Sequence, residues 1–271
     1  MLAASIFRDS EASLTDGGNY VGTSVKVSDS VTFTAAASSL TPQSEEFEVP
    51  AFPSIDQAMG PQKLYDRRRA EGSMASVTWD FANWGGLGLT VSDTSEHNGL
   101  LGGVSSGALS VSRLAHTSAA GLSARVGFGD GWVSTASFSS GFTHLDLRAN
   151  GLVTGADTLY SRAYGVAISK FGVFADNDSI GLALTRPIHV YQGGIDLTAD
   201  TDMDASGNLI QSSEHVSLSS KTPETDLETG YMTSYLNGAL SLQANAAYQM
   251  NVDGRTGTNA VTLLSRVRFN F

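Results

Sequence analysis

Residues 260–271 read AVTLLSRVRFNF, and this stretch decides the fold class of the chain. Successive side chains of an extended strand point to opposite faces. One face therefore carries Val261, Leu263, Val267, Phe269 and Phe271. The other carries Thr262, Leu264, Arg266, Arg268 and Asn270. This pattern is typical of a strand in an outer-membrane β-barrel, where apolar residues face lipid, polar residues face the lumen and an aromatic residue lies at the interface.

The stretch just before it repeats the pattern over residues 240–251. Apolar positions are Leu240, Leu242, Ala244, Ala246, Tyr248 and Met250. Mostly polar residues alternate with them: Ser241, Gln243, Asn245, Ala247, Gln249 and Asn251. About ten residues is the length that a tilted strand needs to cross a membrane. The two stretches together predict a pair of membrane strands.

Similar alternating runs extend over most of the chain. Two short ones fall at 20–27 and 31–35. Further strands are expected as a pair within 75–92 and at 105–115, 121–128, 131–142, 160–171, 178–186, 188–199, 213–220 and 226–236. We therefore predict an all-β fold: a transmembrane antiparallel β-barrel of about twelve strands with a short helix in or near its lumen. With this strand order the long connections fall on both rims, whereas barrels of this kind keep them on one.

Composition excludes several classes of function. The chain of 271 residues contains no cysteine, which rules out disulfides and thiolate metal sites. Its formal net charge of −11 disfavours nucleic acid as a partner. The chain contains no run of about eighteen apolar residues, which is the length that a membrane-spanning helix needs. The first residues lack the basic start and apolar core of a secretory signal, so we expect a removed leader or a piece of a longer polypeptide.

Residues 1–60 are expected to be the end of a passenger or an extension, with a Ser-, Thr-, Glu- and Pro-rich linker at 36–53. Residues 61–271 are then the barrel with its linker helix. Pro61 suits the first turn of that helix, which would run through Arg67, Arg68 and Arg69. We expect the three arginines to meet lumen-facing carboxylates, with Asp80, Asp226 and Glu228 as candidates. The alternative is a solvated helix end whose cations complement the helix dipole.

Motifs for catalysis are weak. Ser105 lies in a G-x-S-x-G string at 103–107, but a loop leading into a strand is the wrong context for a nucleophile elbow. Residues 72–75 (GSMA) have no histidine or aspartate partner motif. His144 with Asp146, and His189 with Asp196, are interpreted as polar residues at strand ends. The acidic run 200–204 lacks the glycine and distal glutamate of a calcium loop. We predict no enzyme activity, cofactor or metal.

Several segments resemble the C-terminal region of autotransporter-type subtilisin-like serine proteases of Gram-negative bacteria. They are residues 164–167 (YGVA), 171–174 (FGVF), 178–182 (DSIGL), 184–190 (LTRPIHV) and 193–197 (GGIDL). The resemblance covers about residues 131–271 and departs at Thr185, where that family usually has glutamine. It implies a translocator or anchor barrel whose peptidase domain would lie N-terminal to this region.

The expected function is therefore passage and surface anchoring of an N-terminal passenger, and the expected location is the cell outer membrane. The expected partners are outer-membrane lipid, the barrel assembly machinery and a covalent or cleaved passenger, such as a subtilisin-like protease. Val267, Phe269 and Phe271 would face lipid in an assembly strand that pairs near residues 77–81. A soluble secreted β-sandwich or adhesin-like module is the main alternative, and a barrel-embedded hydrolase using Ser105 is a weaker one.

Overall fold

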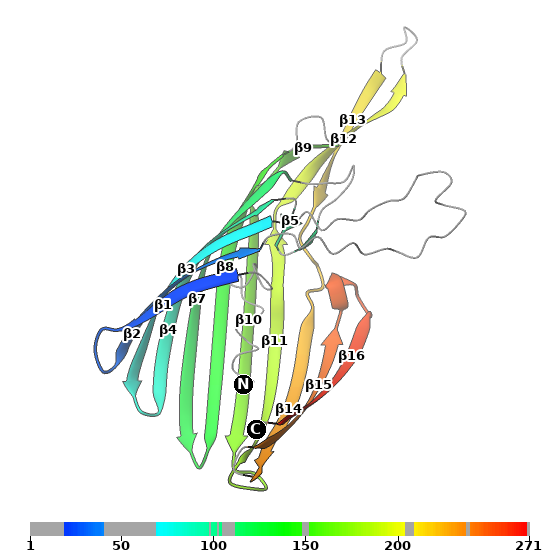
Figure 1. The fold of residues 1–271 in the computed structure, drawn as a ribbon. Coiled ribbons are helices and arrows are strands. Elements are labelled where there is room, and N and C mark those ends of the chain that lie inside the picture. The colour runs from blue at the N-terminus through cyan, green and yellow to red at the C-terminus, as the bar shows by residue number, and fades with distance from the viewer. Residues whose placement is uncertain are drawn as a thin grey trace.

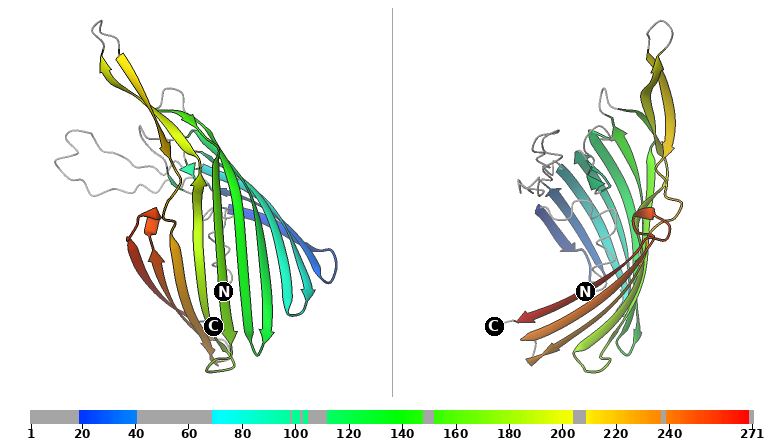
Figure 2. Two further views of the ribbon diagram at one scale, coloured as in Figure 1. Left: turned by 180° about the vertical axis from the view of Figure 1, so that it is seen from behind. Right: turned by 90° about the vertical axis from the view of Figure 1, so that its right-hand side faces the viewer.

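The computed structural model describes residues 19–40, 69–97, 99–101, 103–104, 112–147, 152–203, 209–236 and 239–269. Its main feature is one antiparallel sheet of eleven strands, in the order β1-β2-β3-β4-β7-β8-β10-β11-β14-β15-β16. The sheet is strongly curved, with a convex and a concave face (Figures 1 and 2). The all-β, antiparallel part of the prediction is confirmed.

The strands of the main sheet are 8 to 16 residues long. They are β1 (Asn19–Lys26), β2 (Val31–Leu40), β3 (Arg69–Ala82), β4 (Gly85–His97), β7 (Leu114–Gly129), β8 (Trp132–Asp146), β10 (Leu159–Phe171), β11 (Asp178–Gln192), β14 (Thr225–Tyr235), β15 (Leu240–Met250) and β16 (Asn259–Phe269). A second sheet contains β9 (Val153–Ala156), β12 (Gly194–Met203) and β13 (Leu209–Ser217). A third pairs β5 (Gly99–Leu100) with β6 (Gly103–Val104). One 3₁₀ turn, η4, spans Val252–Gly254.

Short and long connections alternate strictly along this sheet. The strand ends that precede short turns, those of β1, β3, β7, β10 and β14, lie at one rim. The strand ends that precede longer connections, those of β2, β4, β8, β11 and β15, lie at the other. The predicted strand order, which placed long connections on both rims, was therefore wrong. Outer-membrane barrels have short turns on the periplasmic side and long loops on the extracellular side. We call the two ends the short-turn rim and the long-loop rim.

Three differences in strand assignment explain that error. The expected strand at 213–220 corresponds to β13, which lies in the second sheet. Residues 121–128 are not a separate strand, because β7 begins at Leu114, while 105–111 lie outside the described residues. Residues 178–186 and 188–192 form one strand, β11, which continues through Pro187. The register between β10 and β11 shifts at this point, and β11 no longer pairs with β14 beyond Thr185. Proline lacks a backbone N–H and is tolerated where no ladder bond is needed.

The short-turn rim is fixed by local turn chemistry. Asp178 accepts hydrogen bonds from the backbone N–H groups of Val173, Phe174 and Ala175 at 2.6, 2.9 and 3.2 Å. It also accepts one from the Tyr231 hydroxyl at 3.0 Å. The carboxylate therefore closes the β10–β11 turn and joins it to β14.

The first 60 residues are not separate from the sheet in the part that the structure describes. β1 pairs with β2, and β2 pairs with β3 from Leu40↔Ala70 to Val31↔Trp79. Residues 36–40, expected in a linker, are strand. A boundary at residue 60 therefore does not follow the strand arrangement. Whether a passenger precedes this chain stays a prediction.

The expected helix is only partly testable, since 61–68 lie outside the described residues. Arg69 and Ala70, its predicted end, belong to β3. The described ranges contain no α-helix, and none of their helices is long and apolar enough to cross a membrane.

Pairing of the C-terminal strand with residues 77–81 was also wrong. Both sides of β3 are occupied, by β2 and β4, so it has no free edge. β16 pairs with β15 from Met250↔Asn259 to Leu240↔Phe269, and it lies at one edge of the sheet with β1 at the other. In place of a closed ring of about twelve strands, the described residues form an open sheet of eleven.

Candidate functional site

The two faces of the main sheet differ sharply in chemistry. Along β10, Ser161, Ala163 and Ala167 are buried, whereas Val166 and Ile168 between and beside them are exposed. In β11, Ala183 is 1% exposed and its neighbours Leu182 and Leu184 are 48% and 45% exposed. Side chains on a concave face converge and cover one another, so the small residues mark the inner face and the large apolar residues mark the outer face.

The ladder carries this assignment to neighbouring strands, because directly opposed residues share a face. From Leu184 the outer face continues through Leu227, Tyr248 and Val261. In the other direction it runs from Val166 through Ala136, Ala124 and Leu87. The inner face carries Ser137, Thr185, Asp226, Glu228, Gln243, Asn245, Arg266 and Arg268. A polar inner face and an apolar outer face are the arrangement of a transmembrane barrel wall.

Aromatic side chains gather toward both ends of the outer wall. Near the short-turn rim, Trp79 and Phe81 pack edge to face at 5.7 Å, and Phe81 and Trp84 at 5.3 Å. Toward the long-loop rim, Tyr160 and Tyr191 lie 6.3 Å apart. From Phe171 to Tyr160 the strand rises roughly 28 Å, taking about 3.3 Å per residue and a tilt of about 40°. That height fits the apolar band of an outer-membrane barrel, which is about 25 Å tall. The wall therefore belongs in an outer membrane.

The carboxylates named from the sequence lie on strands. Asp226 and Glu228 oppose the inner residues Thr185 and Ala183. Asp80 Oδ1 accepts a hydrogen bond from Arg125 Nη2 at 3.1 Å, an ion pair that sequence reasoning missed. Gly86 makes room for it, because a Cβ there would lie 2.5 Å from Asp80 Oδ1. Arg125 was visible only as a polar residue in the alternating run 121–128.

The arginine triplet is not brought to these carboxylates in the part that the structure describes. Arg67 and Arg68 lie outside the described residues. Arg69 opposes His97 in β3, on the outer face near the long-loop rim, and its Nε donates to Glu71 at 3.1 Å. A lumen-bound triplet therefore does not include Arg69.

The pairing of β16 with β15 shows on which face the residues of the C-terminal strand lie. Val267 opposes Leu242 and Phe269 opposes Leu240, on the same face as Tyr248. Phe271 lies outside the described residues. A role of these residues in assembly stays a prediction.

His116, His189 and His215 lie in polar contacts, whereas His144 contacts an aromatic ring. His144 packs edge to face on Phe142, while Asp146 pairs with Arg113. A chain of contacts joins Ser95 Oγ to His116 Nδ1 at 3.1 Å and His116 Nε2 to Asp93 at 3.2 Å. Ser95, on β4, opposes Glu71 on β3 and His116 on β7. Ser105 lies outside the described residues.

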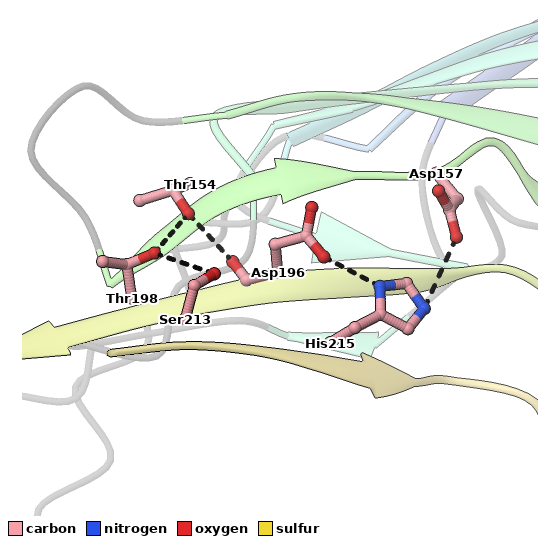
Figure 3. A network of polar contacts seen from close by, with 6 residues as sticks. All are labelled: Thr154, Asp157, Asp196, Thr198, Ser213 and His215. Carbon is pink, nitrogen blue, oxygen red and sulfur yellow. Dashed lines mark hydrogen bonds and ion pairs between the residues drawn. The ribbon is translucent and has the colours of Figure 1, made fainter. Parts of the chain in front are cut away.

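A polar network lies in the small sheet at the long-loop rim (Figure 3). His215 on β13 contacts Asp196 Oδ1 on β12 at 2.8 Å through Nδ1 and Asp157 Oδ2 at 3.7 Å through Nε2. The hydrogen bond to Asp196, aided by both carboxylate charges and opposed by burial, raises the pKa of His215 above 6.5. Within the described residues, no three histidine, aspartate or glutamate side chains gather in a way that could hold a metal ion.

Comparison with known proteins identifies no family. No family model matches the chain. No curated protein matches it either. Among solved structures, the toluene transporter TodX of Pseudomonas putida is 12% identical with a TM-score of 0.49, over 94% of this chain and 73% of that one. The toluene transporter TbuX of Ralstonia pickettii is 11% identical with a TM-score of 0.48, over 90% and 70%. A FadL homologue of Pseudomonas aeruginosa is 11% identical with a TM-score of 0.32, over 92% and 75%.

Proposed function

We propose that this chain forms the wall of an outer-membrane β-barrel whose polar inner face lines a passage. The observation that carries the proposal is the alternation along β10 and β11, with large apolar side chains outside and small or polar ones inside. In lipid every backbone polar group must be paired, and strands achieve this only when the wall closes into a ring. Seven consecutive strands, β4 to β15, keep the alternation in register.

The inner face indicates what would pass. Its residues on β8, β10 and β11 are mostly serine, glycine, alanine and threonine, including Ser139, Gly141 and Ala163. Small polar side chains leave room for water and offer hydrogen bonds, which suits polar solutes or an extended polypeptide. They offer little apolar surface to a hydrocarbon.

The test is made with the full chain after detergent extraction and reconstitution into vesicles. A closed barrel changes its mobility on a denaturing gel after boiling, and its vesicles should release a trapped small polar dye. Extraction by salt without detergent, with no mobility shift, would contradict the membrane wall. Vesicles that retain the dye would contradict the polar passage.

A second candidate is the translocator or anchor of an N-terminal passenger. The resemblance of residues 164–197 to autotransporter barrels favours it. The strand direction also suits it, because β1 starts at the long-loop rim, so a segment joined ahead of it would meet the wall on the surface side. An epitope fused before Met1 should then be cleaved by protease added to intact cells. An epitope that is protected until the cells are broken would exclude this candidate.

A further inference from the structure

Two arginines face outward on β10 and β11, just beyond the apolar part of the wall. Arg162 follows Val166 and Tyr164 along the outer face of β10, and Arg186 opposes Tyr164 from β11. We call these two arginines with their aromatic and histidine neighbours the arginine–tyrosine patch. It consists of Tyr160, Arg162, Tyr164, Arg186, His189 and Tyr191.

Each guanidinium is held by stacking on a ring. Arg162 Cζ lies 4.8 Å from the centre of the Tyr191 ring, and Arg186 Cζ lies 5.0 Å from that of Tyr164. Arg162 Nε also donates to His189 Nε2 at 3.4 Å. Such contacts orient a guanidinium without neutralising its charge.

Neither of these arginines has a carboxylate within 4.0 Å in the described part of the chain. The arginines that do are Arg69, Arg113 and Arg125. The stacked patch therefore presents positive charge that is available to an anion from outside the protein.

The height of the patch identifies the source of that anion. Arg162 lies nine residues from Phe171 along β10, which puts it roughly 23 Å above the short-turn rim at about 3.3 Å per residue and a tilt of about 40°. An apolar band of about 25 Å ends at this level. Lipid phosphates lie at that boundary, and an arginine fork can bind a phosphate with two hydrogen bonds.

We propose that the arginine–tyrosine patch binds the phosphate group of a lipid in the outer leaflet. The proposal rests on the membrane placement given under the proposed function. Arg162 and Arg186 supply the charge-assisted hydrogen bonds, and the tyrosine rings lie against the upper acyl chain. The apolar residues below, Val166 and Leu184, continue the contact along the same chain.

The experiment uses the purified full chain in detergent, with lipid A, a phosphorylated glycolipid, as the probe and native mass spectrometry as the readout. The double variant Arg162→Ala/Arg186→Ala should bind lipid A about tenfold more weakly than wild type. The double variant Arg162→Lys/Arg186→Lys keeps the charge and should lose less. The matched control is Arg266→Ala/Arg268→Ala, which removes two inner-face arginines of β16 and should bind as wild type does.

Three results would overturn the proposal: equal binding of lipid A by wild type and the alanine double variant, equal binding of dephosphorylated lipid A, or displacement of lipid A by inorganic phosphate. The last would show a site for free phosphate rather than lipid. The gel mobility shift is measured on every variant. Its presence in the alanine double variant shows that the barrel has folded, and its absence in wild type would count against the proposed function instead.

Discussion

His215 and Asp196 face each other across the β12–β13 ladder, with Nδ1 of the imidazole 2.8 Å from Oδ1 of the carboxylate. Asp157, on the connection between β9 and β10, approaches the other ring nitrogen. Two glycines make room for this contact: a Cβ on Gly155 would lie 2.3 Å from Asp196 Oδ2, and one on Gly194 would lie 2.6 Å from His215 Nε2. The histidine thus links β13 to the rest of the long-loop rim.

The first prediction is that this link depends on pH. The pKa of folded His215 is raised above 6.5, mainly by the hydrogen bond to Asp196. Its stabilising effect is therefore fully present below pH 6.5 and is lost as the pH rises through the folded-state pKa. Hydrogen exchange of the β13 amides, corrected for intrinsic rates, should be slower at about pH 6 than at about pH 9. His215→Asn should abolish the difference, and His116→Asn should keep it. A difference that survives His215→Asn would contradict the prediction.

A second prediction concerns the lipid-facing side of β16. Leu263 opposes Ala246 on the outer face near mid-strand, and its neighbour Leu264 opposes Asn245 on the inner face. An arginine on the lipid face costs about 2–4 kcal/mol at the midplane and about 0–1 kcal/mol near an interface. Leu263→Arg should therefore lower the amount of heat-modifiable protein in the outer membrane far more than Leu264→Arg. Val267→Arg lies nearer the short-turn rim and should have a smaller effect than Leu263→Arg. Equal levels of the Leu263 and Leu264 variants would reject the face assignment.

The third prediction concerns the turn between β10 and β11. Asp178→Ala removes the acceptor of three backbone N–H groups and of the Tyr231 hydroxyl. Leaving such donors unpaired costs about 1–3 kcal/mol. The urea midpoint of the gel mobility shift should fall accordingly, and Asp178→Asn should restore part of it. Asp176→Ala, an exposed carboxylate in the same turn, is the control and should not change the midpoint.

A fourth prediction concerns the inner-face ion pair of Asp80 and Arg125. Both side chains are 49% exposed, so the pair contributes only about 0–1 kcal/mol to stability. The charges of the two side chains should affect ion passage more than they affect stability. Arg125→Ala removes a positive charge from the inner wall and should shift the reversal potential in planar bilayers toward greater cation selectivity. Arg69→Ala, on the outer face, should not. Unchanged selectivity in Arg125→Ala would show that Asp80 and Arg125 do not line the passage.

The sequence predicted the bounds of a strand well where apolar and polar residues alternate regularly along it. The pair β15–β16 was predicted closely, because alternation of period two is strong where one face meets lipid. β11 was divided in two because Pro187 interrupts its pattern. The sequence could not show that β11 has lost its β14 partner there, so the missing N–H costs no ladder bond.

Side-chain contacts between residues on different strands could not be predicted from the sequence. The contact of His215 with Asp196 depends on the register of β12 and β13, and Asp157 joins it only because β9 pairs with β12. Arg186 meets Tyr164 as its direct partner in the β10–β11 ladder, and Arg162 meets Tyr191 beyond the register shift between these strands. Alternation assigns side chains to faces but does not align one strand with the next. Long-range registers therefore had to come from the structure.

The odd number of strands in the main sheet of the described residues has a mechanical consequence. Ten antiparallel steps separate β1 from β16, so both edge strands run toward the short-turn rim. A ring made from these eleven strands alone must join its ends in a parallel seam, where hydrogen bonds are slanted and each residue contributes slightly less. An antiparallel closure requires a strand of opposite direction between the two edges. Under load, a parallel seam would be the first part of the wall to separate.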